Sequence, residues 1–152
     1  MTQALYEVNM KQWNDIKGEF KTDGSLRDIY AENINLEKWD EFLRSIRLTG
    51  FKLEFTHGDK PMELPNTISE IKQLQETDPT TLFIWLGDTI QINCHFFMDT
   101  EIEMDVSPHD VTSESAYLLL VNFLGWLATL TNKNVKLTHE GSQEQVILNV
   151  GN

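Results

Sequence analysis

The chain has 152 residues, of which 40% are hydrophobic and 24% charged, the proportions of an ordinary soluble globular domain. Its 24 acidic and 12 basic residues give a net charge of −12, which excludes nucleic acid and anionic membranes as natural partners because both attract positive surfaces. The sequence has no leader pattern and no apolar run of membrane-spanning length, and its single cysteine cannot form an internal disulfide. We therefore expect one cytoplasmic domain over residues 1–152.

The N-terminal third of the chain predicts a β-hairpin followed by a helix. The first dozen residues carry no clear pattern. Residues 13–34 surround Asp23-Gly24, a strong two-residue turn signal, and their apolar side chains gather on one face if the segment forms a hairpin. Asn35 can cap a helix that runs to about Arg47, because apolar residues follow it at helical spacing.

The next segment predicts a second hairpin and a second helix. Residues 51–55 alternate apolar and charged side chains, which is typical of a strand, and Pro61 confines the returning strand to an edge of the sheet. Thr67 and Glu70 fit a capping box, which predicts the start of the second helix there.

Residues 81–106 predict three strands, and the two connections between them decide which side chains share a face. A two-residue turn at 87–88 sets the first register. A three-residue loop at 99–101 sets the second, because it keeps the apolar side chains of both strands together and places His95 opposite Asp105. The remaining face mixes polar, acidic and apolar groups. Our candidate partner-binding residues on and beside this mixed face are Leu82, Ile84, Gln91, Asn93, His95, Phe97, Glu101, Glu103 and Asp105.

The most apolar stretch of the chain is residues 112–131, in which few polar residues interrupt the apolar character. A helix that is apolar nearly all round is buried, so we expect this one at the centre of the core. A last hairpin over residues 135–150 follows it. The order of elements predicts an α+β fold, with a mainly antiparallel sheet built from hairpins and about three helices packed on one side.

The chain carries no recognisable catalytic or metal-binding motif. It lacks a Gly-x-Ser-x-Gly elbow, a phosphate-binding glycine loop and a His-Glu-x-x-His helix. The acidic residues between 99 and 105 alternate along a strand, and that row is too linear for one compact oxygen cage around a metal ion. We therefore expect neither a catalytic site nor a metal or cofactor. A small enzyme that uses His95 with Asp105 stays open as an alternative.

The charge of the chain is unevenly distributed. Between residues 73 and 132 there are nine acidic residues and no lysine or arginine. Such a segment produces a negative surface field, which favours a cationic protein as partner. Apolar groups rimmed by polar ones often mark interaction sites, so we expect the mixed face to bind a basic protein. The protein itself would be a monomer or a weak homodimer, and a structural homo-oligomer ranks lower because its acids would repel one another.

Three stretches of the chain, DGSLRDIY (23–30), ELPNTISEI (63–71) and INCHFFMDTEIEMDVSP (92–108), are similar to those of small acidic immunity proteins. Bacteria encode such proteins beside polymorphic or contact-dependent toxins. The resemblance is one of kind, namely an acidic α+β domain without a catalytic signature, and it carries over no individual site residue. It implies a protein that binds a cognate toxin, commonly a nuclease, and blocks its active site or another essential surface.

Overall fold

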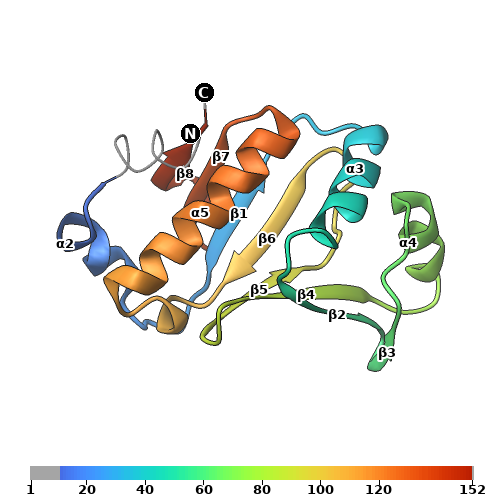
Figure 1. Ribbon diagram of the computed structural model, residues 1–152, viewed down its shortest axis with the longest axis horizontal. Coiled ribbons are helices and arrows are strands. Elements are labelled where there is room, and N and C mark those ends of the chain that lie inside the picture. Colours follow the sequence, from blue (N-terminus) through green and yellow to red (C-terminus); the bar gives the residue numbers. More distant parts are fainter. Residues whose placement is uncertain (1–10, 152) are drawn as a thin grey trace.

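The computed structural model describes residues 11–151, so most of the first dozen residues lie outside the described part. An eight-stranded sheet, in which all paired strands are antiparallel, carries helices on one face (Figure 1). The predicted α+β fold is therefore confirmed. The strands are β1 (Arg27–Ala31), β2 (Lys52–His57), β3 (Lys60–Met62), β4 (Thr80–Leu86), β5 (Ile90–Cys94), β6 (Ile102–Val106), β7 (Val135–His139) and β8 (Ser142–Val150). The helices within the described part are α2 (Trp13–Ile16), α3 (Leu36–Ile46), α4 (Ile68–Leu74) and α5 (Glu114–Thr131), with 3-10 turns η1 (Lys17–Phe20) and η2 (Pro108–Asp110).

The strand order is β3-β2-β4-β5-β6-β1-β7-β8, so β1 lies inside the sheet between β6 and β7. The predicted hairpin over residues 13–34 is wrong, because its first half forms α2 and η1 and only β1 is a strand. Ile16 and Phe20 are both buried, and their spacing of four suits a helical turn as well as a strand. Arg27 of β1 is also buried, and its Nε donates a hydrogen bond to the carbonyl of Glu19 at 2.8 Å, which ties η1 to the sheet.

The predicted helix starts at Asn35 and Thr67 are confirmed by their caps, and the structure places the start of α5 after Ser113. The side chains of Asn35, Thr67 and Ser113 each accept a hydrogen bond from the backbone N–H three residues later, at 2.8, 3.2 and 3.2 Å. Such a bond satisfies one of the N–H groups that the first turn of a helix leaves without a partner. Helix α5 ends at Thr131, and the residue after it, Asn132, has a φ of 56°, the left-handed conformation common after a helix.

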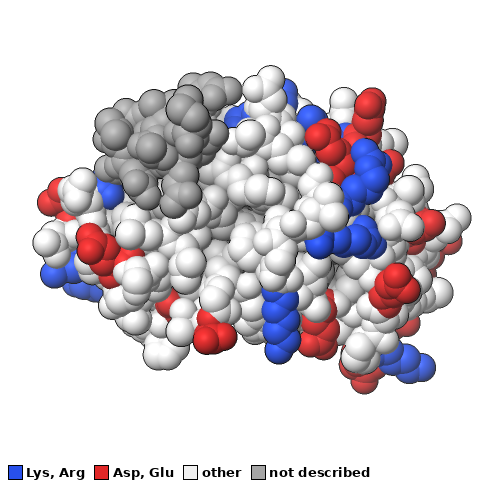
Figure 2. Space-filling view, viewed as in Figure 1, with Lys and Arg blue, Asp and Glu red and all other residues white. Residues whose placement is uncertain are grey.

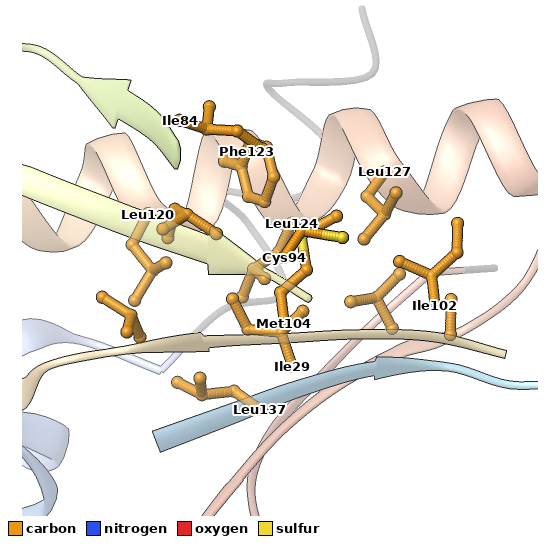
Figure 3. Close-up of a cluster of buried hydrophobic side chains, with 14 of the residues drawn as sticks. Ile29, Ile84, Cys94, Ile102, Met104, Leu120, Phe123, Leu124, Leu127 and Leu137 are labelled. Carbon is orange, nitrogen blue, oxygen red and sulfur yellow. The ribbon is translucent and has the colours of Figure 1, made fainter. Parts of the chain in front are cut away.

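Helix α5 lies across the sheet and supplies the centre of the core (Figure 1). Figure 3 shows its side chains Leu120, Phe123, Leu124 and Leu127 packed against apolar side chains of the strands. The strand residues labelled there are Ile29, Ile84, Cys94, Ile102, Met104 and Leu137. Of the helices in the described part, α5 alone is long and apolar enough to cross a membrane, and 56% of it is buried inside the fold. This burial is typical of the core helix of a soluble protein.

The predicted register between β4 and β5 is wrong by one residue. Their turn holds residues 87–89 instead of two residues, so each side chain of β4 faces the opposite way from the prediction. Leu82 and Ile84 are fully buried in the core and do not lie on the mixed face, whereas Phe83 and Trp85 are half-buried on the face away from the helices. Because β4 is apolar at nearly every position, its own pattern fits either orientation.

The register between β5 and β6 also differs from the prediction, but by two residues, so each side chain keeps its predicted face. Asn93, instead of His95, lies directly opposite Asp105. The shift follows from the conformation of Phe96, whose φ is 58° and whose ring is buried. Because this conformation is not that of a strand, β5 ends at Cys94. The connection to β6 is consequently longer than the predicted three residues.

Replacing Ile84 by alanine tests the corrected register. Ile84 is fully buried beside Phe123 of α5, so Ile84→Ala should lower the free energy of unfolding by about 2–5 kcal/mol. Phe83 is half-buried on the opposite face, and Phe83→Ala should cost less than about 2 kcal/mol. Urea unfolding followed by circular dichroism measures both values. A larger loss from Phe83→Ala than from Ile84→Ala would contradict the register.

Candidate functional site

The face of the sheet away from the helices carries alternate side chains of each strand in rows across the sheet. One row runs from Phe83 through Asn93 and Asp105 to Asp28, because these residues are register partners on β4, β5, β6 and β1. The acidic face, as we call the centre of this surface, consists of Phe83, Trp85, Gln91, Asn93, His95, Glu101, Glu103 and Asp105. All of these side chains are half-buried.

A chain of polar contacts crosses the acidic face. Gln91 Nε2 donates to Asn93 Oδ1, and Asn93 Nδ2 donates to Asp105 Oδ1, both at 2.8 Å. The other carboxylate oxygen of Asp105 lies 3.6 Å from His95 Nε2, which is longer than a hydrogen bond and becomes an ion pair when the ring is protonated. His95 Nδ1 lies 3.1 Å from the hydroxyl of Thr81. These contacts orient the side chains of Gln91, Asn93, His95 and Asp105 on the face.

Glu103 lies among other carboxyl groups. Burial raises the pKa of Glu103 above its usual value, and the nearby charges of Asp28, Glu101 and Asp105 raise it further. Within residues 11–151, none of Glu101, Glu103 and Asp105 forms an ion pair with a lysine or arginine. The acidic face therefore holds carboxylates that repel one another.

Asp28 and Tyr30 of β1 close one side of the acidic face. Asp28 is 7% exposed, and its Oδ2 accepts hydrogen bonds from the Tyr30 hydroxyl at 3.2 Å and from the Gly141 N–H at 2.9 Å. Burial raises the pKa of the Tyr30 hydroxyl, and the charges of Asp28 and Glu103 raise it further. The phenol thus stays protonated and keeps donating to Asp28 at neutral pH.

Lysines on strands β2 and β7 make their contacts away from the carboxylates of Glu101, Glu103 and Asp105. Lys52 of β2 lies over the ring of Trp85, with its Nζ 4.9 Å from the ring centroid. Lys136 of β7 pairs with Glu32 at 2.8 Å. The helix side of the molecule differs: lysines and arginines lie among the acids around α3, and few charges lie over α5 (Figure 2). Acidic and basic side chains are therefore mixed around α3, whereas Glu101, Glu103 and Asp105 lie together without a lysine or arginine partner among the described residues.

The structure brings most of the predicted site residues together. The predicted residues that lie on the acidic face are Gln91, Asn93, His95, Glu101, Glu103 and Asp105. Phe97 lies in the loop after β5, where its ring centroid is 5.1 Å from that of His95, and the corrected register places Leu82 and Ile84 in the core. Sequence reasoning missed Phe83 and Trp85, although their alternation along one strand was a signal once the turn length was known.

The chemistry available at this face is mainly electrostatic. Among the residues that the structure describes, no group of three or more His, Cys, Asp and Glu side chains could hold a metal ion. Burial raises the pKa of the Cys94 thiol to about 12, so the nucleophilic thiolate is scarce at neutral pH. The contacts from Thr81 through His95 to Asp105 do join a hydroxyl, an imidazole and a carboxylate, the groups from which an activated nucleophile is built.

The chain matches no protein-family model, no curated protein and no solved structure. The geometry and charge of the acidic face are therefore the features that indicate a function for the chain.

Replacing Glu103 by glutamine tests the repulsion on this face. The pKa of Glu103 is raised in the folded chain, so folding favours the protonated carboxyl group. The stability that Glu103 contributes is therefore fully present below the usual pKa of glutamate and is lost as the pH rises through the raised pKa. Glu103→Gln should therefore raise the free energy of unfolding at pH 7, by up to about 1 kcal/mol after solvent screening. The gain should disappear near pH 4.

Urea unfolding at the two pH values measures this difference. Glu144→Gln, an exposed position on β8, is the matched control and should change little at either pH. A Glu103→Gln variant that is less stable than the wild type at pH 7 would show that Glu103 makes a favourable contact in its charged form.

Proposed function

We propose that the chain is a non-catalytic protein-binding domain whose acidic face binds a basic surface of another protein. The observation that carries the proposal is the set of half-buried carboxylates on a sheet face that no helix of residues 11–151 covers (Figure 1). Burial first, and then the neighbouring carboxylates, disfavour the charged form of Glu103 and raise its pKa, so the free protein keeps this carboxylate charged at a cost in free energy. A lysine or arginine from a partner would relieve the repulsion, so binding gains more there than at scattered surface acids.

The aromatic members of the acidic face support a protein partner over a small cation. The rings of Phe83 and Trp85 lie 6.0 Å apart on β4, one strand away from β6 and its carboxylates across β5, and both side chains are half-buried. Aromatic side chains supply large contact areas at protein interfaces, and arginine stacks on them while pairing with acids. A surface that offers both kinds of group suits a folded partner with basic and apolar residues.

In its most concrete form, the proposal is that the chain is a bacterial immunity protein that neutralises a basic toxin, such as a nuclease, in the cytoplasm. The acidic face supports this role because the substrate groove of a nuclease is basic, as it binds the phosphate backbone. A rigid acidic surface can occupy such a groove by charge and shape complementarity. The acidity of this face also favours a free monomer or weak homodimer, since two acidic faces would repel each other.

Reversing two charges on the acidic face tests the proposal. The wild-type chain is used to retain proteins from the source lysate at low salt, and a basic protein released by high salt is identified and purified. With that protein, Glu103→Lys combined with Asp105→Lys should lower the association rate constant roughly tenfold or more and weaken its dependence on salt. Surface plasmon resonance at several salt concentrations measures both effects. The wild-type chain should also inhibit the toxic activity of the retained protein.

A control variant separates a local effect from net charge. Asp59→Lys with Glu144→Lys makes the same charge change at exposed positions, in the β2–β3 turn and on β8, and should lower the rate much less. Equal effects of the two double variants would mean that net charge alone steers binding. Unchanged binding by Glu103→Lys with Asp105→Lys, or the absence of any basic partner, would overturn the proposal.

A small enzyme is the second candidate, and the contacts among Thr81, His95 and Asp105 are the observation that favours it. An activated ester such as p-nitrophenyl acetate reports catalysis by a hydroxyl and an imidazole. On the binding proposal, we expect Thr81→Ala and His95→Ala to hydrolyse this ester at the wild-type rate. A rate at least tenfold lower in both variants would favour the enzyme.

A further inference from the structure

We infer that the loop from Phe96 to Glu101, here called the anchor loop, inserts Phe97 and Met98 into an apolar pocket of the basic partner. This inference rests on the proposed function and names the part of the surface that holds the partner once charge has brought it near. Phe97 and Met98 are consecutive in the sequence, and both side chains are exposed, by 61% and 50% respectively. Exposed apolar side chains that lie together and are bordered by polar groups often mark an interaction site.

The start of the anchor loop is held in a strained backbone conformation. Phe96 has a φ of 58°, which is unfavourable for a bulky residue. Its ring is 1% exposed and packs against Trp39 and Phe55, with ring centroids 5.4 and 6.2 Å apart. Burial of the Phe96 ring in the core thus holds the conformation that turns the following residues outward. Such strain persists only where the surroundings impose it, and it is often found at functional sites.

Hydrogen bonds fix the loop near both ends. The carbonyl of Phe96 accepts hydrogen bonds from Lys72 Nζ at 3.1 Å and from Gln75 Nε2 at 3.0 Å, both from the α4 region. Near the other end, the N–H of Ile34 donates to the carbonyl of Thr100 at 2.8 Å. Residues 97–99 are exposed between these two fixed points. A loop held in one conformation before binding loses little entropy when it binds, which increases affinity.

The charges around the tip of the anchor loop identify the kind of partner. Asp99 is exposed beside Met98, and Asp78 lines a surface pocket of about 370 Å³ that Phe97 also borders. The Phe97 ring is in contact with His95, so the apolar tip continues into the acidic face. The occupant that fits is an apolar pocket of a protein bordered by lysine or arginine. An anionic membrane and a second copy of this chain would both be repelled by these acids.

The test compares two double variants with the purified basic protein that the wild-type chain retains at low salt. Phe97→Ser with Met98→Ser should raise the dissociation rate constant on the order of 100-fold and leave the salt dependence of association unchanged, because an apolar anchor acts after the encounter. Leu36→Ser with Leu48→Ser, which changes apolar side chains that are 51% and 85% exposed on the helix side, should alter the dissociation rate less than twofold. Thermal unfolding should be the same for all three proteins, since each changed side chain is exposed.

The outcomes separate this inference from the proposed function. If Phe97→Ser with Met98→Ser dissociates at the wild-type rate while Glu103→Lys with Asp105→Lys associates slowly, the anchor-loop inference is overturned and the proposed function stands. Wild-type binding by both variants, or no basic partner, would overturn both. Sedimentation of the chain without a partner adds a further test. If the wild-type chain is a dimer and the variant with Phe97→Ser and Met98→Ser is a monomer, a second copy of the chain contacts the loop, and the inference is wrong.

Discussion

Helix α5 buries its apolar surface against α3 and against the sheet, where it contacts the strands β1, β4, β7 and β8. Each of these strands turns alternate side chains toward the helix, so the intervening side chains must lie on the opposite face. Leu82 and Ile84 therefore enter the core, and Phe83 and Trp85 are left half-buried outside. The packing of α5 thus decides which side chains of β4 face outward, and it places Phe83 and Trp85 on the acidic face.

The position of β1 concentrates the charge of that face. β1 pairs with β6, which lies about 75 residues later in the chain, and this pairing puts Asp28 beside Asp105 and Tyr30 beside Glu103. The long-range pairing thus adds a buried carboxylate to acids that are already close on β6 and in its loop. Arg27, the neighbour of Asp28, faces the helices, and its guanidinium donates hydrogen bonds to the carbonyls of Glu19 and Lys21. Its charge is therefore directed away from the carboxylates of the acidic face. The repulsion at Glu103 consequently depends on the tertiary fold and not on the sequence of β6 alone.

Charge and shape act at different stages in the proposed binding. The field of the carboxylates acts over about one Debye length and speeds encounter with a basic protein, whereas an apolar anchor acts only in contact and slows separation. Strain at Phe96 links the two, because it ends β5 and turns Phe97 outward next to His95. The conformation that weakens the strand is thus the one that joins an apolar tip to an acidic surface.

The sequence by itself determined the fold class, the helix starts at Asn35 and Thr67, the buried central helix, and the acidity of residues 73–132. These features follow from local periodicity, capping side chains and composition. It also placed the polar residues of β5 and β6 on one face, since a shift of two residues preserves side-chain direction. Only the tertiary structure decided the orientation of β4, whose residues are apolar in both phases, and the helical form of residues 13–20, where spacing of four fits a helix or a strand. The same is true of the pairing of β1 with β6, because no local pattern specifies which distant strand becomes a neighbour; that choice depends on how the whole sheet packs against α5.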